Sequence, residues 1–256
     1  MNVFLTGASS GIGAALAREF ARRGARLGLV ARRADALQAL AAELSGPCQV
    51  YALDVTDRER LLAAARDFDH RCGGTDVVVA SAGISTGVQT EYYEDLEVFD
   101  RVLATNLNAV VTSFHPFIGA MRKRRRGTLV AIASVAGVRG LPGSEAYCAS
   151  KAALINYCES LRVGLRGSGI RVVTIAPGFV RTPMTDANPY PMPFLMDAQA
   201  FAVRAVDAIA RGSSYTVIPW QMAWVAKLLR ALPNWAFDPL LAGRARKPRA
   251  SDVQRD

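Results

Sequence analysis

The sequence predicts an α/β protein with a doubly wound sheet of about seven parallel strands and helices on both faces. Short β-branched apolar runs alternate along the 256 residues with longer stretches rich in alanine and leucine. Most of the longer stretches carry apolar residues three and four positions apart, as amphipathic helices do. A glycine-rich segment follows the first apolar run directly, where such folds turn from strand into helix.

The order of elements follows from this alternation. Strands are expected at Asn2–Leu5, Arg26–Ala31, Gln49–Leu53, Asp76–Ala80, Thr128–Ala133, Arg171–Ile175 and Tyr215–Ile218. Helices are expected near 11–23, 34–44, 57–71, 95–123, 147–166 and 197–211. The segment Thr182–Ala198, between the sixth expected strand and the last expected helix, contains Pro183, Pro189, Pro191 and Pro193. This composition predicts a loop over a cleft. We expect residues 1–220 to form one domain, to which 221–256 adds an apolar helical extension and a basic tail.

Composition excludes several classes of protein. Apolar residues make up 51% of the chain and charged residues 21%, so there is enough apolar surface to offset the entropy of ordering the chain. The four cysteines form no CxxC pair and the two histidines stand alone, so we expect reduced thiols, no metal site and a cytoplasmic protein. Met1–Thr6 runs straight into the glycine-rich segment, which leaves no room for a secretion signal.

The segment Thr6-Gly7-Ala8-Ser9-Ser10-Gly11-Ile12-Gly13 predicts a nucleotide cradle of the Rossmann type. Gly7 permits a tight turn, Gly11 lets the backbone approach a pyrophosphate, and Gly13 allows close packing of the helix. The helix N-terminus offers free N–H groups and the positive end of a dipole. The spacing is GxxxGxG and not GxGxxG, so the prediction depends on the flanking strand and helix. The cofactor-binding residues expected here are Thr6, Gly7, Ser9, Ser10, Gly11, Ile12 and Gly13.

The end of the second strand predicts which dinucleotide is bound. Arg32 and Arg33 stand where an Asp or Glu would accept hydrogen bonds from the adenosine ribose and select NAD. The forked guanidinium of arginine suits a 2′-phosphate, so we expect NADP(H). Two solvated arginines at the start of a helix are the alternative interpretation.

A second constellation predicts chemistry on an oxygen atom. Ser134 follows the fifth strand, Tyr147 lies 13 residues later, and Lys151 lies one helical turn beyond it. A phenol has a pKa of about 10, which a nearby ammonium and an oxidised nicotinamide would lower. Tyr147 could then exchange a proton with a carbonyl or alcohol oxygen that the Ser134 hydroxyl holds by a hydrogen bond.

By these motifs the chain resembles the short-chain dehydrogenase/reductase family from residue 1 to about 220. The resemblance implies that Asn106 is a fourth catalytic residue, which holds a water in the proton relay behind Lys151, and that Lys151 also holds the nicotinamide ribose. It further implies cofactor contacts at Asp54, Val55, Ser81, Ala82, Gly83, Asn106, Tyr147, Lys151, Pro177, Gly178, Val180 and Thr182. Ser81 stands where the family has Asn, a departure that places local stability in doubt more than catalysis. The family also implies a homodimer or homotetramer formed through the helices near 95–123 and 147–166.

The resulting hypothesis is an NADP-dependent oxidoreductase that interconverts an alcohol and an aldehyde or ketone. Apolar residues of the 183–196 loop favour an apolar substrate; they are Tyr190, Met192, Phe194, Leu195 and Met196. Two alternatives stay open: a ketoreductase acting on carrier-bound acyl chains, and a non-catalytic NADP sensor. Cys148, beside Tyr147, is interpreted as a packed side chain and not as a reactive thiol.

The net charge of +9 resides in two segments. Residues 122–126 carry +5 at the end of a predicted helix, and 244–256 carry a net +3, so the body of the chain is nearly neutral. The first segment has no interleaved aromatic residues, so we expect a solvated helix end and no nucleic-acid partner. Residues 217–241 hold all three tryptophans at amphipathic spacing. This favours either peripheral contact with the inner face of a membrane or packing against another subunit or the substrate cleft.

Overall fold

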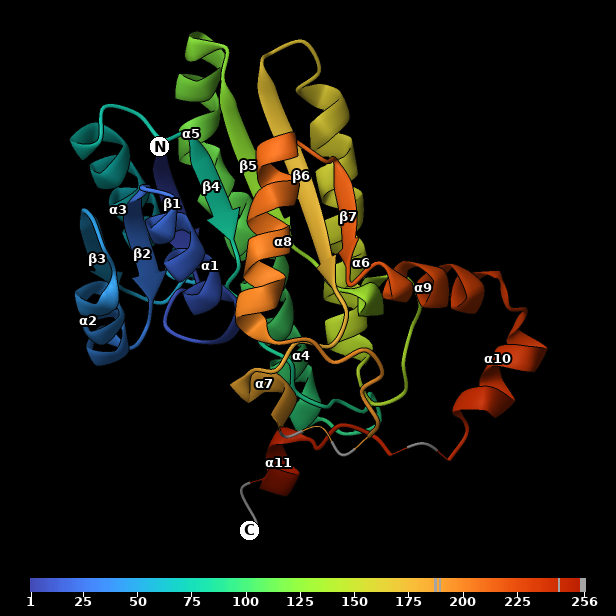
Figure 1. Ribbon diagram of the computed structural model, residues 1–256. Coiled ribbons are helices and arrows are strands. Elements are labelled where there is room, and N and C mark those ends of the chain that lie inside the picture. Colours follow the sequence, from blue (N-terminus) through green and yellow to red (C-terminus); the bar gives the residue numbers. More distant parts are fainter. Residues whose placement is uncertain (187, 189, 244, 254–256) are drawn as a thin grey trace.

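Seven parallel strands form one sheet in the order β3-β2-β1-β4-β5-β6-β7, as Figure 1 shows. The computed structural model describes residues 1–186, 188, 190–243 and 245–253. The strands are β1 (Asn2–Thr6), β2 (Arg26–Ala31), β3 (Cys48–Ala52), β4 (Val77–Ala80), β5 (Gly127–Ile132), β6 (Ile170–Pro177) and β7 (Tyr215–Ile218). The predicted fold class is therefore confirmed: β2 and β7 have the predicted bounds, and the ends of the other strands differ from the predicted ones by at most two residues.

Helices cover both faces of the sheet and enclose two apolar cores. One core lies under α1 (Gly11–Arg22), α2 (Ala34–Glu43) and α8 (Ala198–Arg211), and the other under α3 (Arg58–Arg71), α5 (Ala109–Arg124) and α6 (Glu145–Gly164). Gly28 in β2 has no side chain, which leaves room for the ring of Phe68 on α3; a Cβ there would lie 2.6 Å from that ring. Burying about ten large side chains under each layer is the main stabilising contribution.

The helix expected near 95–123 is confirmed over 94–124, but it contains a π-helical segment that the sequence did not predict. The chain forms α4 (Glu94–Leu103), one π-helical segment (Ala104–Asn108) and then α5. The wider π turn contains Asn106, which is fully buried and hydrogen-bonded outside its own helix. A π segment inserts one residue into the helical repeat, often at functional sites, and apolar periodicity alone does not reveal it.

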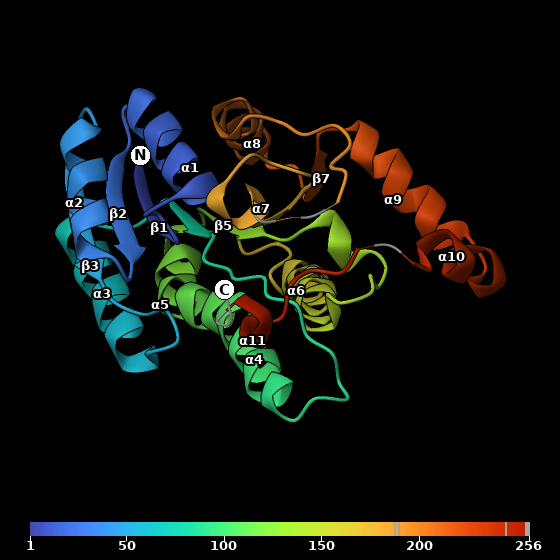
Figure 2. The same ribbon diagram turned by 90° about the horizontal axis from the view of Figure 1, so that it is seen from below.

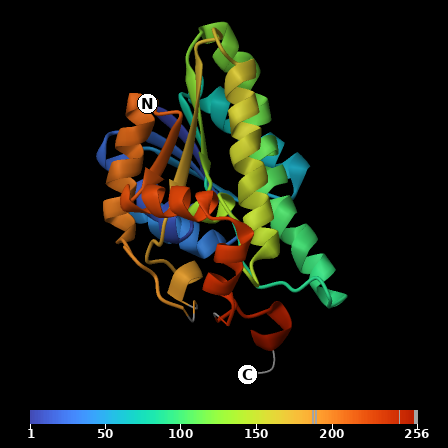
Figure 3. The same cartoon turned by 90° about the vertical axis from the view of Figure 1, so that its right-hand side faces the viewer.

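The chain after β7 forms three short helices. These are α9 (Gln221–Ala231), α10 (Asn234–Leu241) and α11 (Ala250–Val253), while a further short helix, α7 (Pro183–Asp186), lies in the loop after β6. α9 ends before Pro233, which cannot continue a helix. Figures 1 and 2 show α9 and α10 standing away from the sheet, and in Figure 3, seen from that side, α9 crosses in front of it. The chain then returns to α11, whose Ala250 packs against α4. Pro189 of the proline-rich loop, and Arg244 and residues 254–256 of the basic tail, lie outside the described residues.

Candidate active site

The strand order reverses at β1, which lies between β2 and β4, so that a crevice opens at the carboxyl ends of these strands. The glycine-rich segment leads from β1 into α1 at this point. Gly7 and Gly11 have φ angles of +72° and +54°, the left-handed region that glycine adopts freely. A Cβ on Gly7 would lie 2.7 Å from Ala82, and one on Gly13 would collide with the carbonyl of Gly7. The backbone here is packed to leave only a shallow cradle at the start of α1, which suits a pyrophosphate.

The end of β4 is tied to the end of β1 by Thr6, a fully buried residue. Its hydroxyl oxygen accepts hydrogen bonds from the backbone N–H groups of Ser81 at 3.2 Å and of Ala82 at 3.3 Å. Serine at position 81 therefore does not leave this backbone unsupported. Replacing the family's Asn by Ser at position 81 had placed the local stability of this segment in doubt. The hydrogen bonds to Thr6 stabilise it.

Two arginines flank the crevice at the end of β2. A terminal nitrogen of Arg33 donates to the Ser9 carbonyl at 3.3 Å and to the Ser9 hydroxyl at 3.4 Å. A nitrogen of Arg32 lies 3.8 Å from the Asp54 carboxylate, and both side chains are largely exposed. A pair this exposed contributes little to stability, so the Arg32 guanidinium is available to a ligand.

Asn106 joins three elements of the site. Its side-chain oxygen accepts from the Ile84 N–H at 2.8 Å, and its NH₂ group donates to the Ile84 carbonyl at 2.9 Å and to the Ser150 hydroxyl at 3.0 Å. The Ser150 hydroxyl in turn donates to the Tyr147 carbonyl at 2.8 Å. The oxygen and the NH₂ group of Asn106 thus both form hydrogen bonds, which hold the segment after β4 against α6. Neither Ser150 nor Ile84 carries a sequence signal that would have predicted this part.

Tyr147 and Lys151 lie one turn apart on α6, with the Lys151 ammonium 5.7 Å from the centre of the phenol ring. The ammonium donates to the Ile132 carbonyl at the end of β5 at 2.9 Å and lies near Gly83. The Ser134 hydroxyl accepts from the Ala136 N–H at 3.1 Å. The structure therefore brings together all four predicted catalytic residues from the ends of β5, the π segment and α6.

Burial dominates the ionisation of this group. It raises the pKa of Tyr147 to about 12, against the opposing hydrogen bond from Ser134, and it lowers the pKa of Lys151 to about 8. The expected lowering of the phenol pKa by Lys151 does not occur in the protein alone, because desolvation disfavours the phenolate more strongly. At neutral pH Tyr147 is a phenol that can give a proton, and Lys151 is an ammonium.

The segment after β6 forms the other wall of the crevice. The Gly178 N–H donates to the Ile218 carbonyl at 2.8 Å, and Val180 is buried in a bridge with Met196. The Thr182 N–H donates to the Thr185 hydroxyl at 3.0 Å, and the methyl of Thr182 would contact a Cβ on Gly11 at 3.2 Å. Thr182 therefore closes the crevice against the glycine-rich cradle, and Thr185 is a supporting residue that the sequence did not indicate.

The remaining predicted contacts lie around the same crevice or beneath it. Asp54 holds the Thr56 N–H and hydroxyl at 2.9 and 2.8 Å, while Val55 is buried in the core under α3 and α5. Ile12 packs on the opposite core, and the Ser10 side chain makes no capping hydrogen bond to α1. Pro177 ends β6.

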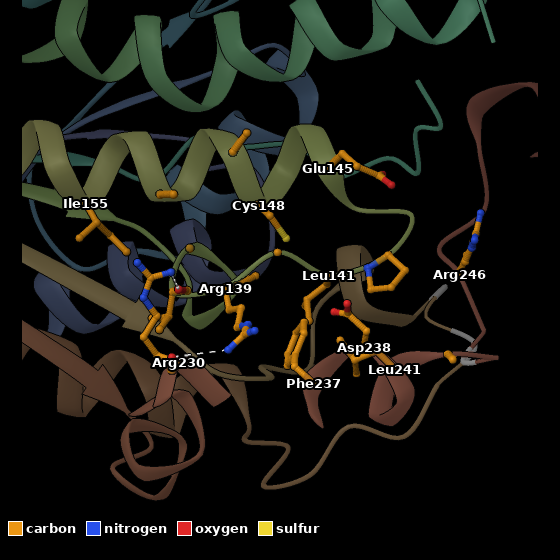
Figure 4. A pocket seen from close by; sticks show the side chains of 18 of the residues that line it. Arg139, Leu141, Glu145, Cys148, Ile155, Arg230, Phe237, Asp238, Leu241 and Arg246 are labelled. Carbon is orange, nitrogen blue, oxygen red and sulfur yellow. Dashed lines mark hydrogen bonds between the residues drawn. The ribbon is translucent and has the colours of Figure 1, made fainter. Parts of the chain in front are cut away.

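A groove of about 1160 Å³ runs along α6, on the helix face next to the one that carries Tyr147 and Lys151. Figure 4 shows its lining: the 136–142 loop, α6 with Cys148 and Ile155, and α10 with Phe237 and Leu241. Ser134, Tyr147 and Lys151 do not line it. Burial raises the pKa of the Cys148 thiol to about 11, which agrees with a packed side chain and leaves almost no reactive thiolate at neutral pH.

Fold and crevice together define a dinucleotide-binding α/β protein. Comparison with known proteins makes the assignment narrower: the family described as short chain dehydrogenase matches residues 1–190. An uncharacterized oxidoreductase of Myxococcus xanthus is 40% identical over 91% of this chain and 93% of its own length. Dehydrogenase/reductase SDR family member 7B of Bos taurus is 33% identical over 97% of this chain and 82% of its own.

Two further similarities agree with this. A 3-oxoacyl-[acyl-carrier-protein] reductase of Thermotoga maritima is 36% identical over 72% of this chain and 76% of its own. The solved structure of a short-chain dehydrogenase from Streptomyces avermitilis superposes with a TM-score of 0.77 at 26% identity, covering 88% of this chain and 91% of that one. The chain belongs to the short-chain dehydrogenase/reductase family and is an NAD(P)-dependent oxidoreductase.

Proposed function

We propose that the protein uses NADPH to reduce an aldehyde or ketone to an alcohol, with Tyr147 as the proton donor. The observation that carries this proposal is the grouping of the half-buried Tyr147 with the buried Ser134 and Lys151 at the carboxyl end of β5. A phenol whose pKa is raised to about 12 is protonated at neutral pH. That is the state a reduction requires, because the oxygen of the carbonyl must gain a proton.

The dinucleotide fits the residues present. Gly7 and Gly13 allow a backbone turn too tight for any Cβ, and the α1 N-terminus to which this turn leads favours phosphate. Arg32, with Arg33 held against Ser9, presents two cations where the 2′-phosphate of NADP would lie. When bound, NADPH supplies a hydride to the carbonyl carbon.

The chain supplies the proton and the orientation. The Ser134 hydroxyl orients the carbonyl oxygen and stabilises the negative charge that develops on it. As the C=O electron pair moves to that oxygen, Tyr147 gives it the phenolic proton, and the ammonium of Lys151 stabilises the phenolate that results. Asn106 acts as a positioning residue, because its side chain holds Ile84 and Ser150 and so fixes the turn of α6 that carries Tyr147.

An apolar carbonyl compound is the substrate class that we propose. A β-bridge between Val180 and Met196 holds the loop after β6 in place. The aromatic ring of Phe194 in this loop is half exposed. Tyr190 packs beside Phe179, with ring centres 6.4 Å apart. These side chains offer an apolar surface to a ligand above the crevice.

The experiment is a screen of NADPH oxidation with aldehydes, ketones, steroids and acyl thioesters, in which Tyr147→Phe is the control. We expect a loss of about 10²- to 10⁴-fold in kcat with the best substrate, while NADPH binding by titration is retained. Full activity of Tyr147→Phe would exclude the mechanism. Tight NADPH binding without turnover of any compound would instead support an NADP sensor.

A ketoreductase of carrier-bound acyl chains is the second candidate, and the similarity to the Thermotoga maritima reductase favours it. Arg122 and Lys123 of the basic segment are exposed, whereas Arg124 and Arg125 donate to the carbonyls of Thr75 and Gly167. An acidic carrier protein would therefore meet two free-standing cations of this segment at the end of α5. Activity on acyl thioesters combined with salt-sensitive carrier binding would select this candidate.

We further propose, on the family resemblance alone, that the protein is a cytoplasmic homodimer or homotetramer. The helices expected to form that contact are α4, α5 and α6, whose outer faces expose Val111 and Val163. We expect the protein to bind neither a nucleic acid nor a metal ion. Sedimentation velocity gives the oligomeric state directly, and a monomer at micromolar concentration would overturn this part.

A further inference from the structure

The residues 219–243, which we call the C-terminal arm, are held in a fixed place away from the sheet. Arg139, in the loop after β5, donates to the Leu229 carbonyl at 2.6 Å and also to the Leu232 carbonyl, and to the Asn234 side chain at 2.9 Å. Its guanidinium lies 3.8 Å from the centre of the Phe237 ring. One half-buried cation thus satisfies the last carbonyls of α9 and fixes the angle at which α10 follows.

The arm exposes an apolar surface on the side away from the protein. Trp220, Trp224 and Leu228 are 63%, 65% and 65% exposed and lie four residues apart, on one stripe of α9. Met222 and Ala226, on the opposite stripe, are buried. Trp235 on α10 is 80% exposed. Every tryptophan of the chain is therefore in the arm and largely exposed, although tryptophan is usually among the most buried residues.

Charge on the arm distinguishes the partners that could cover this surface. The arm contains Lys227, Arg230 and one carboxylate, Asp238, which lines the groove beside the 136–142 loop. The exposed stripe itself has no acidic residue, and the Lys227 ammonium lies 5.0 Å from the Trp224 ring. A symmetric contact between two arms would bring the same cations of both copies together without a carboxylate from this stripe to pair with them. Anionic lipid headgroups complement the cations, and the ring of tryptophan is favoured at the boundary between headgroups and acyl chains.

The exposed stripe also lies at the functional end of the molecule. In Figures 1 and 2 the arm, the start of α4 and α7 surround the end toward which the strands point. Tyr93 and Leu96 at α4, and Met184 and Phe194 in and after α7, are further exposed apolar residues at this end. No helix among the described residues has the length and apolar character needed to cross a bilayer.

We propose that the C-terminal arm binds the protein peripherally to the surface of an anionic phospholipid bilayer, with Trp220, Trp224, Leu228 and Trp235 entering the interface. Lys227 and Arg230 supply the electrostatic part of the binding. The proposal does not depend on the reaction catalysed, since it rests on the arm alone.

The test uses tryptophan fluorescence, which in this protein reports only on the arm. Vesicles of phosphatidylcholine with about equal phosphatidylglycerol are expected to shift the emission to the blue and to co-sediment with the protein at low salt. Binding should weaken in high salt and with pure phosphatidylcholine. Lys227→Gln should weaken binding about fivefold, and replacing Trp220 and Trp224 together by Gln about tenfold or more.

Arg211→Gln is the matched control for Lys227→Gln, because Arg211 is exposed at the end of α8, away from the arm and from the proposed subunit contact. This variant should bind vesicles as the parent does, and NADPH titration shows that each variant is folded. The absence of co-sedimentation with anionic vesicles would overturn the proposal. So would sedimentation velocity in which the double Trp variant converts an oligomer to a smaller species, because the stripe would then be a subunit contact.

Discussion

The guanidinium of Arg249 donates to both carboxylate oxygens of Asp95, at 2.8 and 3.2 Å, across 154 residues of sequence. Arg249 is also bonded to Glu94 and lies 3.6 Å from the centre of the Tyr92 ring. Asp95 is 2% exposed, and its pKa is lowered despite the opposing effect of burial, because Arg249 and the Gln89 N–H bind its oxygens. This contact holds the segment that follows the C-terminal arm against the start of α4.

Arg249→Met keeps most of the side chain but leaves the buried Asp95 carboxylate without its cation. We expect the free energy of unfolding to fall by about 3 kcal/mol, as when one partner of a buried pair is removed. Urea unfolding followed by far-ultraviolet circular dichroism measures this. Arg211→Met, at the exposed end of α8, is the control and should change stability by less than about 0.5 kcal/mol. Equal losses in both variants would show that the pair with Asp95 is not the cause.

Arg32→Asp should reverse the cofactor preference. Removing a guanidinium from the 2′-phosphate and adding a carboxylate there should weaken NADPH binding about 10- to 100-fold, while NADH binding is unchanged or improved. Fluorescence titration with both dinucleotides measures the ratio. Arg26→Asp places the same charge change at the opposite end of β2 and should leave the ratio unaltered. An unchanged ratio for Arg32→Asp would refute NADP selection by this residue.

Gly13→Ala should abolish dinucleotide binding, because its Cβ would collide with the Gly7 carbonyl and push the cradle open. Gly119→Ala is the matched control: this glycine lies inside α5, and a Cβ there meets nothing within 4 Å. Replacing glycine by alanine in a helix stabilises by about 0.5–1 kcal/mol, so the control should bind normally and melt slightly higher. Calorimetric titration with NADPH separates the two, and normal binding by Gly13→Ala would contradict the cradle.

The rate of reduction should depend on pH through Lys151, whose pKa burial lowers to about 8. Below this value the ammonium is present and stabilises the phenolate left on Tyr147; above it the charge is lost as pH rises. We expect kcat/KM to fall about tenfold per pH unit above 8. Lys151→Arg keeps the charge to higher pH, so the decline should move upward or disappear. An identical profile in both proteins would show that Lys151 does not set it.

The sequence determined the sheet, because apolar runs of strand length and amphipathic spacing are local properties. It also indicated the glycine cradle and the group of Ser134, Tyr147 and Lys151, because the type of each residue and the spacing between them are both visible in the sequence. The helix over 95–123 was predicted without its π segment, because a single inserted residue hardly changes the apolar periodicity. The buried bonds of Asn106 to Ile84 and Ser150 could not be predicted, as they join residues 22 and 44 positions apart.

By itself, then, the sequence determined the order of elements and the kinds of chemical group available, since both depend on neighbours along the chain. Only the tertiary structure decided how those groups ionise: burial raises the pKa of Tyr147, where proximity to Lys151 had suggested that it would be lowered. It also decided that the tryptophans face outward, that Arg139 holds the arm and that Arg249 holds the chain after it. Desolvation and exposure are properties of the packed chain, because they depend on every residue that surrounds a group and not on its position in the sequence.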